Sequence, residues 1–205
     1  MTITIISWIA ALLILLTASG LLLARDWRWI LGLLAGQYLA SFWLVTRHWP
    51  LGMAAVKLVT GWMAITALAM TLLALSPQSD ENNEQFLPQG NGFRLFACGV
   101  TALIVIAAAP RIEEAVPGLG FPVIAGGLLS IGMGFLQLGS ASDTLRVIVG
   151  LLTVLTGFET LYAAIESSVL VAGLLAATNL GLALVGAYLL TNSAAEETSD
   201  GDEIS

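Results

Sequence analysis

Long apolar stretches recur along nearly the whole of this chain, and they limit its possible folds more than any other feature. A helix needs about 20 residues to cross about 30 Å of hydrocarbon. Backbone polar groups inside a bilayer must be bonded within the protein, which restricts spanning segments to helices or to strands of closed barrels. The period-two alternation of a barrel is missing from this sequence. The sequence therefore predicts an all-α fold, a polytopic bundle of about seven transmembrane helices.

Charged or helix-breaking residues end each of the predicted spans. The spans are expected at 3–24, 29–46, 51–76, 93–109, 118–138, 145–166 and 168–191. The fourth is the shortest, because Pro110 is expected to end it, and "RIEEAVPG" is interpreted as a short polar turn. Ser167 and Ser168 leave almost no loop between the last two spans, which predicts a tight helical hairpin. No clean internal repeat is visible.

The composition divides the chain into five regions. They are an N-terminal three-helix membrane region at 1–76, an acidic polar loop at 77–92, the fourth helix with its turn at 93–117, a C-terminal three-helix region at 118–191 and a disordered acidic tail at 192–205. Glycines are dense in the fifth and seventh spans and predict close helix packing, either within the bundle or against a larger subunit. The first span lacks a basic leading segment and is interpreted as a retained span, not a signal peptide.

Charge indicates the cellular setting. Only 10% of the 205 residues are charged, against about 25% in average globular chains. The net charge of −7 comes mostly from the loop and the tail, and the seven basic residues are dispersed, which argues against nucleic-acid binding.

Arginines near span ends are more numerous on one side of the predicted bundle. This predicts a protein of the cell membrane with its N-terminus outside and its tail in the cytoplasm. The arginines are Arg25, Arg28, Arg94 and Arg146 on the cytoplasmic side, against Arg47 and Arg111.

The usual constellations of enzyme active sites are absent from the sequence. Cys98 is the one cysteine and is expected to be a buried small hydrophobe, so no disulfide or thiolate metal site is expected within the chain. His48 is the one histidine and lies at a span end, so no histidine pair is expected to hold a metal or haem. There is no phosphate-binding glycine-rich loop with a lysine. We expect no cofactor, and at most a non-redox membrane subunit of an oxidoreductase complex.

Three ionisable residues fall inside the predicted spans, where charge is costly and usually marks function. Lys57 either extends to the interface or acts as a counter-ion or proton relay. Glu159 lies deeper, and it either satisfies a helix–helix hydrogen bond or forms part of a proton path. Glu166 follows by seven residues, which puts both carboxylates on one helix face about 10.5 Å apart, with Glu166 at the interface. Gln37, Gln137 and Asn179 are weaker polar companions.

The segment "RVIVGLLTVLTGFETLYAAIESS" and the apolar run after it resemble the last two helices of the K-chain of respiratory complex I, and the similar C subunit of multisubunit sodium/proton antiporters. Gly157-Phe158-Glu159 matches the Gly-x-Glu of the second helix in that family, and Gly181-Leu182-Ala183-Leu184 matches the run that ends its third. The longer chain, with Gln37 and Lys57 in its front half, is closest in length to the E component of formate-hydrogenlyase-type membrane hydrogenases. The second buried glutamate of the family has no counterpart here, because Asn179 lies near that position.

The resemblance implies a membrane subunit that contributes polar residues to proton or ion translocation. Its partners would be antiporter-like or hydrogenase-like membrane subunits, which would hold any redox cofactors. The candidate path residues are Glu159, Lys57, Glu166, Asn179 and Gln37. Two alternatives stay open: a structural or assembly membrane protein without transport activity, and a small self-contained transporter. The lack of a visible repeat or of a broken-helix pair argues against the last.

Overall fold

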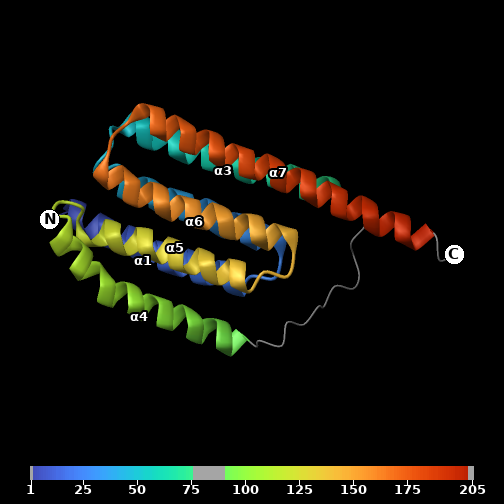
Figure 1. Cartoon of the computed structure of the whole chain (residues 1–205), viewed down its shortest axis with the longest axis horizontal. Helices are drawn as coiled ribbons and strands as arrows, with labels where there is room; N and C mark the ends of the chain where they lie inside the picture. Colours follow the sequence, from blue (N-terminus) through green and yellow to red (C-terminus); the bar gives the residue numbers. More distant parts are fainter. Residues whose placement is uncertain (1, 76–90, 203–205) are drawn as a thin grey trace.

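Seven helices form the fold of the computed structural model, which describes residues 2–75 and 91–202. They are α1 (Thr2–Leu23), α2 (Trp27–Val45), α3 (Leu51–Leu75), α4 (Asn91–Ala115), α5 (Phe121–Gly139), α6 (Thr144–Ile165) and α7 (Val169–Asp202). They run up and down the long axis of the molecule (Figure 1). The predicted all-α bundle is thus confirmed.

Six of the seven helices are long and apolar enough to cross a membrane, and they indicate a multi-pass membrane protein. The exception is α2, whose 19 residues include Arg28, Gln37 and Tyr38. The Gln37 and Tyr38 side chains in its middle are fully buried, so α2 turns these two polar groups away from its surroundings. The predicted second span is therefore a helix of adequate length but of weaker apolar character.

Two helix ends differ from the sequence prediction. Helix α4 continues through Pro110 to Ala115, so "RIEEA" is helical and not a polar turn. Proline is tolerated near the end of a membrane helix because little of the helix beyond it depends on the missing N–H. Helix α7 continues to Asp202, so the backbone of 192–202 is helical where a disordered tail is predicted. The predicted acidic loop at 77–92 lies almost wholly outside the described residues.

The helices form two three-helix units with the same direction of travel. In the first unit α1 packs on α2 and α2 on α3, and in the second α5 packs on α6 and α6 on α7. Across the units α1 lies beside α5, α2 beside α6 and α3 beside α7. Figure 1 shows α3 and α7 together along one edge, and α4 alone along the opposite edge. Helix α4 connects the units in sequence and packs on α5 and α1.

A sequence match accompanies this arrangement. Arg28-x-Ile-x-Gly-Leu-Leu in α2 recurs 118 residues later from Arg146 in α6, and both helices begin after an aspartate. Helices α3 and α7 begin 118 residues apart as well, at Leu51 and Val169. From this match and the shared order of helices we infer an internal repeat, which inspection of the sequence alone misses because the match is confined to five positions.

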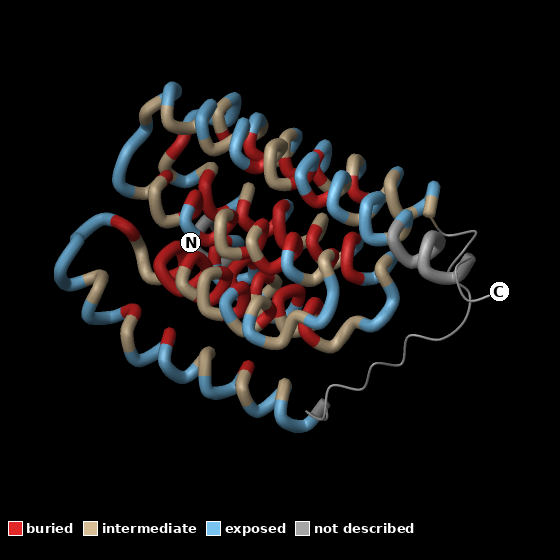
Figure 2. Tube along the Cα trace, turned by 45° about the vertical axis from the view of Figure 1, so that its right-hand side comes forward, coloured by how far each residue is buried: buried red, intermediate tan, exposed pale blue. Residues whose placement is uncertain are grey.

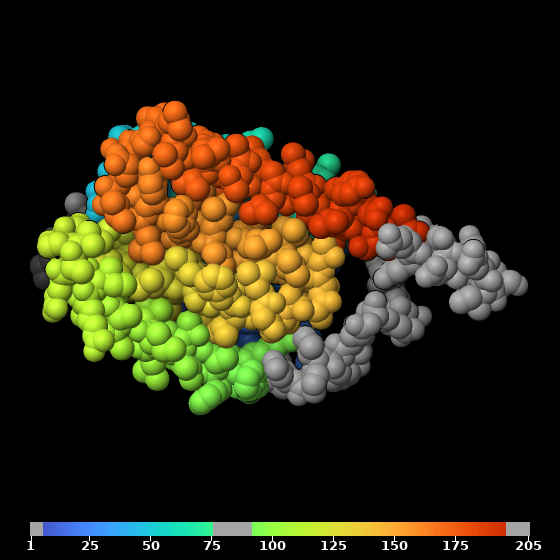
Figure 3. Space-filling model, in the orientation of Figure 1, coloured from blue at the N-terminus to red at the C-terminus, as the bar shows by residue number. Residues whose placement is uncertain are grey.

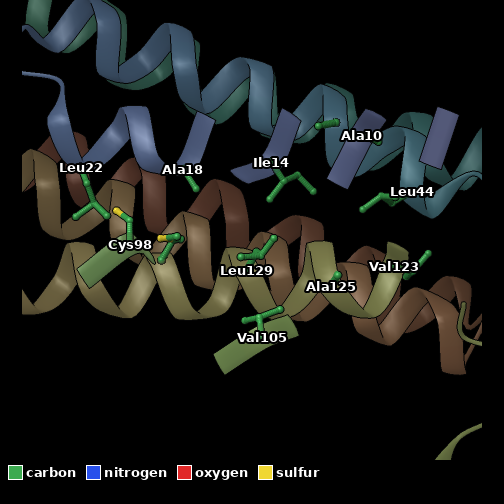
Figure 4. Close-up of a cluster of buried hydrophobic side chains, with 12 residues drawn as sticks. Ala10, Ile14, Ala18, Leu22, Leu44, Cys98, Val105, Val123, Ala125 and Leu129 are labelled. Carbon is green, nitrogen blue, oxygen red and sulfur yellow. The ribbon is translucent and has the colours of Figure 1, made fainter. Parts of the chain in front are cut away.

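The core lies between the units. Of the spanning windows, 61% of α5 and 56% of α6 are buried, against 17% of α3, α4 and α7 (Figure 2). One large apolar cluster joins α1 to α2, α4 and α5, and its members follow one another along the bundle axis (Figure 4). Cys98 belongs to this cluster and is buried, as expected. Space-filling shows α4 and α7 along opposite edges of the molecule (Figure 3).

Glycines bring the backbones of α5 and α6 together. A Cβ on Gly157 would lie 2.6 Å from the carbonyl oxygen of Gly127, and one on Gly134 would lie 2.8 Å from the backbone nitrogen of Val154. Side chains cannot fit at such distances, so the two helices touch through glycine. The predicted tight packing is confirmed for α5. In α7 it is confirmed at Gly186, where a Cβ would lie 2.8 Å from the Ile148 side chain, but not at Gly173 and Gly181, where a Cβ would meet nothing within 4 Å.

Candidate functional site: a buried ion pair between the two units

Lys57 of α3 and Glu159 of α6 form an ion pair inside the bundle. Both side chains are 4% exposed. Each residue lies six positions from the helix end at the same end of the bundle, a depth of about 9 Å at 1.5 Å per residue. Lys57 therefore points inward to a carboxylate and does not extend to the interface. Because α3 belongs to the first unit and α6 to the second, the pair joins the two units.

The remaining oxygen of the carboxylate is also bonded. Asn179 of α7 donates from Nδ2 to Oε1 of Glu159 at 2.8 Å. The Tyr38 hydroxyl of α2 donates to Oδ1 of Asn179 at 2.7 Å, and all three side chains are buried. The ammonium of Lys57 lies 6.0 Å from the centre of the Tyr38 ring and 3.4 Å from the backbone oxygen of Thr156. Four helices thus supply one hydrogen-bonded chain that ends on Glu159.

A threonine stripe on α6 supports the same region. Thr153, Thr156 and Thr160 are spaced by three and four residues and are all buried. Each donates its hydroxyl proton to the backbone oxygen four residues earlier, at 2.8 Å. Since a hydroxyl has one proton, the 2.6 Å contact between Ser41 and Thr160 requires Ser41 to be the donor. The polar face of α6 is therefore bonded both to its own backbone and to α2.

Two glutamines extend the polar region toward α5. Nε2 of Gln37 lies 3.4 Å from the Ser130 hydroxyl, and the Thr153 hydroxyl lies 3.4 Å from Oε1 of Gln137. Among the described residues, Oε1 of Gln37 and Nε2 of Gln137 have no hydrogen-bond partner, although both are buried. Buried amide groups without partners are uncommon and are the usual positions of ordered water. The polar residues therefore form a band across the bundle from α5 to α3.

A small pocket reaches the ion pair from the outer face between α3 and α7. Its lining includes Lys57, Glu159, Thr60 and Leu175, and it has room for about one water molecule. The pair is thus buried, but only this small pocket and the side chains that line it separate the pair from the molecular surface.

The five sequence-predicted candidates divide into three groups. Glu159, Lys57 and Asn179 meet directly, and Gln37 is fully buried one residue from Tyr38. Glu166 stands apart. Helix α6 ends at Ile165, and Glu166 caps it in an extended conformation with an exposed side chain. The two carboxylates consequently do not share a helix face, and the backbone oxygen of Glu166 accepts from Nε1 of Trp49 at 2.8 Å.

Sequence reasoning missed Tyr38, Ser41 and Thr156. The i, i+3, i+7 spacing of the α6 threonines was a readable signal, because it puts them on one helix face. Tyr38 and Ser41 have no comparable signal, since single aromatic and hydroxyl residues are common in membrane helices. Among residues 2–75 and 91–202, no cluster of metal-ligating side chains is present.

Comparison of the chain with protein-family models, with curated proteins and with solved structures gives no match.

Proposed function

We propose that this protein moves protons or small cations across a membrane, and that the Lys57–Glu159 pair is the group whose charge changes during transport. The observation that carries the proposal is the position of the pair at the contact between two parallel three-helix units. Ionisable residues inside a membrane usually mark an ion path. Transporters built from repeats bind their substrates and coupling ions near the repeat interface.

The energetics of the pair favour a functional role over a purely structural one. Taking two charges out of water costs several kcal/mol per ion, which their attraction offsets only with good geometry and further hydrogen bonds. Well-packed apolar residues would hold the same helices together at least as well. A bundle that needed only cohesion at this point would gain nothing from Lys57 and Glu159.

The pair has the chemistry that a proton carrier needs. Uptake of a proton by the Glu159 carboxylate from one side leaves the pair with one positive charge, on Lys57, and release of a proton to the other side restores the neutral pair. The charge of the pair thus changes by one for each proton carried, while Asn179 and the backbone oxygen of Thr156 remain as hydrogen-bond partners of the two groups. The water-sized pocket between α3 and α7 would give a proton carried by one water molecule access to both side chains.

The second question is whether the chain works alone. The resemblance of 118–191 to the complex I K-chain supports a subunit that works beside antiporter-like or hydrogenase-like partners, and the pocket at the α3–α7 face would lie against such a partner. The internal repeat supports a self-contained transporter, because it removes the argument that no repeat exists. We place the subunit first, since the described helices enclose no wide passage between the units.

A structural role without transport is the remaining alternative. It is favoured by one observation: Glu159 finds its cation and its amide donor within this chain, so no partner is needed to satisfy it.

The experiment that separates these functions is a proton-flux measurement in liposomes. The chain, purified natively together with any membrane subunits that co-elute, is reconstituted with a pH-sensitive dye inside, and a potassium diffusion potential is applied. The wild type is compared with Glu159→Gln and with the double variant Lys57→Met/Glu159→Leu. Glu166→Gln is the matched control, because that carboxylate is exposed at a helix end. We expect flux in the wild type and the control, and none in the other two.

Flux that requires co-purified membrane subunits, identified by mass spectrometry of the native complex, would assign the subunit role. Flux from the chain alone would assign the self-contained transporter. A double variant that is folded and transports as well as the wild type would leave the structural role.

A further inference from the structure

A crevice of about 190 Å³ opens at one end of the bundle between α4, α5 and the end of α1, far from the ion pair. Its apolar walls include Leu22, Phe93 and Phe135, and both phenylalanines are more than half exposed. Its polar wall includes Arg94, at the start of α4, and Ser140 at the end of α5. The crevice therefore combines an apolar body with a cationic end.

Arg94 is incompletely bonded in this crevice. One terminal nitrogen donates to the backbone oxygen of Leu22 at 3.1 Å, which fixes the direction of the guanidinium. Its Nε is buried and has no hydrogen-bond partner among the described residues. An arginine whose N–H group is withheld from water and unpaired has a donor left for an anionic oxygen, and phosphate is the group that the guanidinium fork fits best.

The lining of the crevice holds a cation and no acidic side chain, because Arg94 is its one charged residue. Both signs of charge occur farther out at this end of the bundle: Arg25, Arg28 and Arg146 lie there, and so do Asp26, Asp143 and the acidic end of α7. Asp143 already pairs with Arg146 at 3.3 Å. Basic pockets between membrane helices at the cytoplasmic surface are typical sites for anionic lipid head groups.

We propose that the crevice binds one anionic phospholipid, with the head-group phosphate on Arg94 and an acyl chain along Phe93 and Phe135. Helix α4 is the helix that connects the two units in sequence, and it packs mainly on α5 and α1. A lipid in the crevice would fill the space between α4 and these neighbours at the arginine-rich end. This proposal does not depend on proton transport.

Native mass spectrometry of the protein released from mixed phosphatidylglycerol and phosphatidylcholine nanodiscs tests the site. We expect the wild type to retain one phosphatidylglycerol, and Arg94→Gln to retain it about tenfold less often, since the variant loses the hydrogen bond between the guanidinium and the phosphate. Arg25→Gln is the control, because it removes the same charge at the same end from an exposed residue that does not line the crevice.

A second variant tests the crevice without touching the arginine. Gly139 lines it, and a Cβ there would meet nothing within 4 Å, so Gly139→Leu fills the space and should also reduce retention. Gly99→Leu, at an equally open glycine of α4 outside the crevice, should not. Equal retention by all four variants and the wild type would overturn the proposal. A different pair of results would assign the site to a soluble anion instead. Millimolar inorganic phosphate would displace phosphatidylglycerol, and the protein would retain phosphatidylcholine as often as phosphatidylglycerol.

Discussion

The two three-helix units have the same order and direction of helices, but they place different side chains at equivalent positions. With the 118-residue offset, Tyr38 corresponds to Thr156, Ser41 to Glu159, Lys57 to Leu175 and Gly61 to Asn179. Every one of these positions lies at or beside the buried network. The first unit thus contributes the cation and the aromatic ring, and the second contributes the carboxylate and the amide.

The difference teaches how a repeat can build one charged site. Two identical units would bring two carboxylates or two lysines together, and like charges at short distance in a low dielectric are strongly unfavourable. With the cation in one unit and the anion in the other, the site is neutral, and the contact between units becomes specific. Gly61 shows the same complementarity in shape, because a side chain there would collide with the Tyr38 ring.

The largest effect is expected from breaking the pair on one side only. Lys57→Met or Glu159→Leu alone leaves a buried unpaired charge or its neutralised form, which should lower the free energy of unfolding by about 3–5 kcal/mol. The double variant should recover most of that loss. Equilibrium unfolding in mixed micelles measures all three, and a double variant as unstable as the sum of the single ones would show that the residues do not interact.

Moving the cation to the other unit sharpens the comparison. Leu175 is the counterpart of Lys57 and lines the same pocket beside Glu159. In the Lys57→Leu background, Leu175→Lys should therefore restore about 1–3 kcal/mol of the lost unfolding free energy. Leu174→Lys, one residue away on the exposed face, is the control and should restore none. Equal behaviour of the two would contradict the equivalence of the units.

Equivalent glycines should respond in opposite ways. Gly150 packs against Leu138, with its Cβ position 3.0 Å from that side chain, whereas Gly32 has nothing within 4 Å. We expect Gly150→Leu to destabilise the bundle by about 1–3 kcal/mol through overpacking. Gly32→Leu should be neutral or slightly stabilising, since leucine favours a helix more than glycine. The same unfolding assay measures both variants, and equal stability of the two would contradict a tight α5–α6 contact at Gly150.

A smaller effect is expected at the aromatic end of the network. Tyr38→Phe removes the hydroxyl that donates to Asn179 and leaves the amide oxygen without its partner. The expected loss is about 1–3 kcal/mol, the cost of one unsatisfied buried acceptor. Adding Asn179→Leu should change stability by less than the sum of the two single effects, because the first change has already broken the bond.

The smallest effect is expected at Glu166. Its side chain is exposed beyond the end of α6, so Glu166→Gln should shift stability by less than about 0.5 kcal/mol. A larger loss would mean that its charge contacts the network after all.

Much of this fold was readable from the sequence, because apolar length decides where a membrane helix runs. Lys57 and Glu159 were also readable, since any charge in an apolar run stands out. Their mutual contact was not, because it depends on the rotation of α3 and α6 about their axes, which no local pattern fixes. Tyr38 was hidden for the same reason. The passage of α4 through Pro110 was missed because proline stops helices more firmly in water than in a bilayer.

The similarity of the two units escaped notice for a different reason. The matching positions lie near the start of α2 and α6, around Arg28 and Arg146, whereas the residues of the buried ion pair differ between the units. A neutral pair requires that difference, so the residues of the candidate site conceal the similarity.

The single connecting helix α4 is needed because each unit has an odd number of helices. A unit of three helices ends on the opposite side of the membrane from where it began, so a second copy joined directly to it would be inserted upside down. One additional helix restores the first orientation, and α4 is that helix. We therefore expect the start of α1 and the end of α7 to face different compartments, so that a reporter fused at each is labelled from opposite sides.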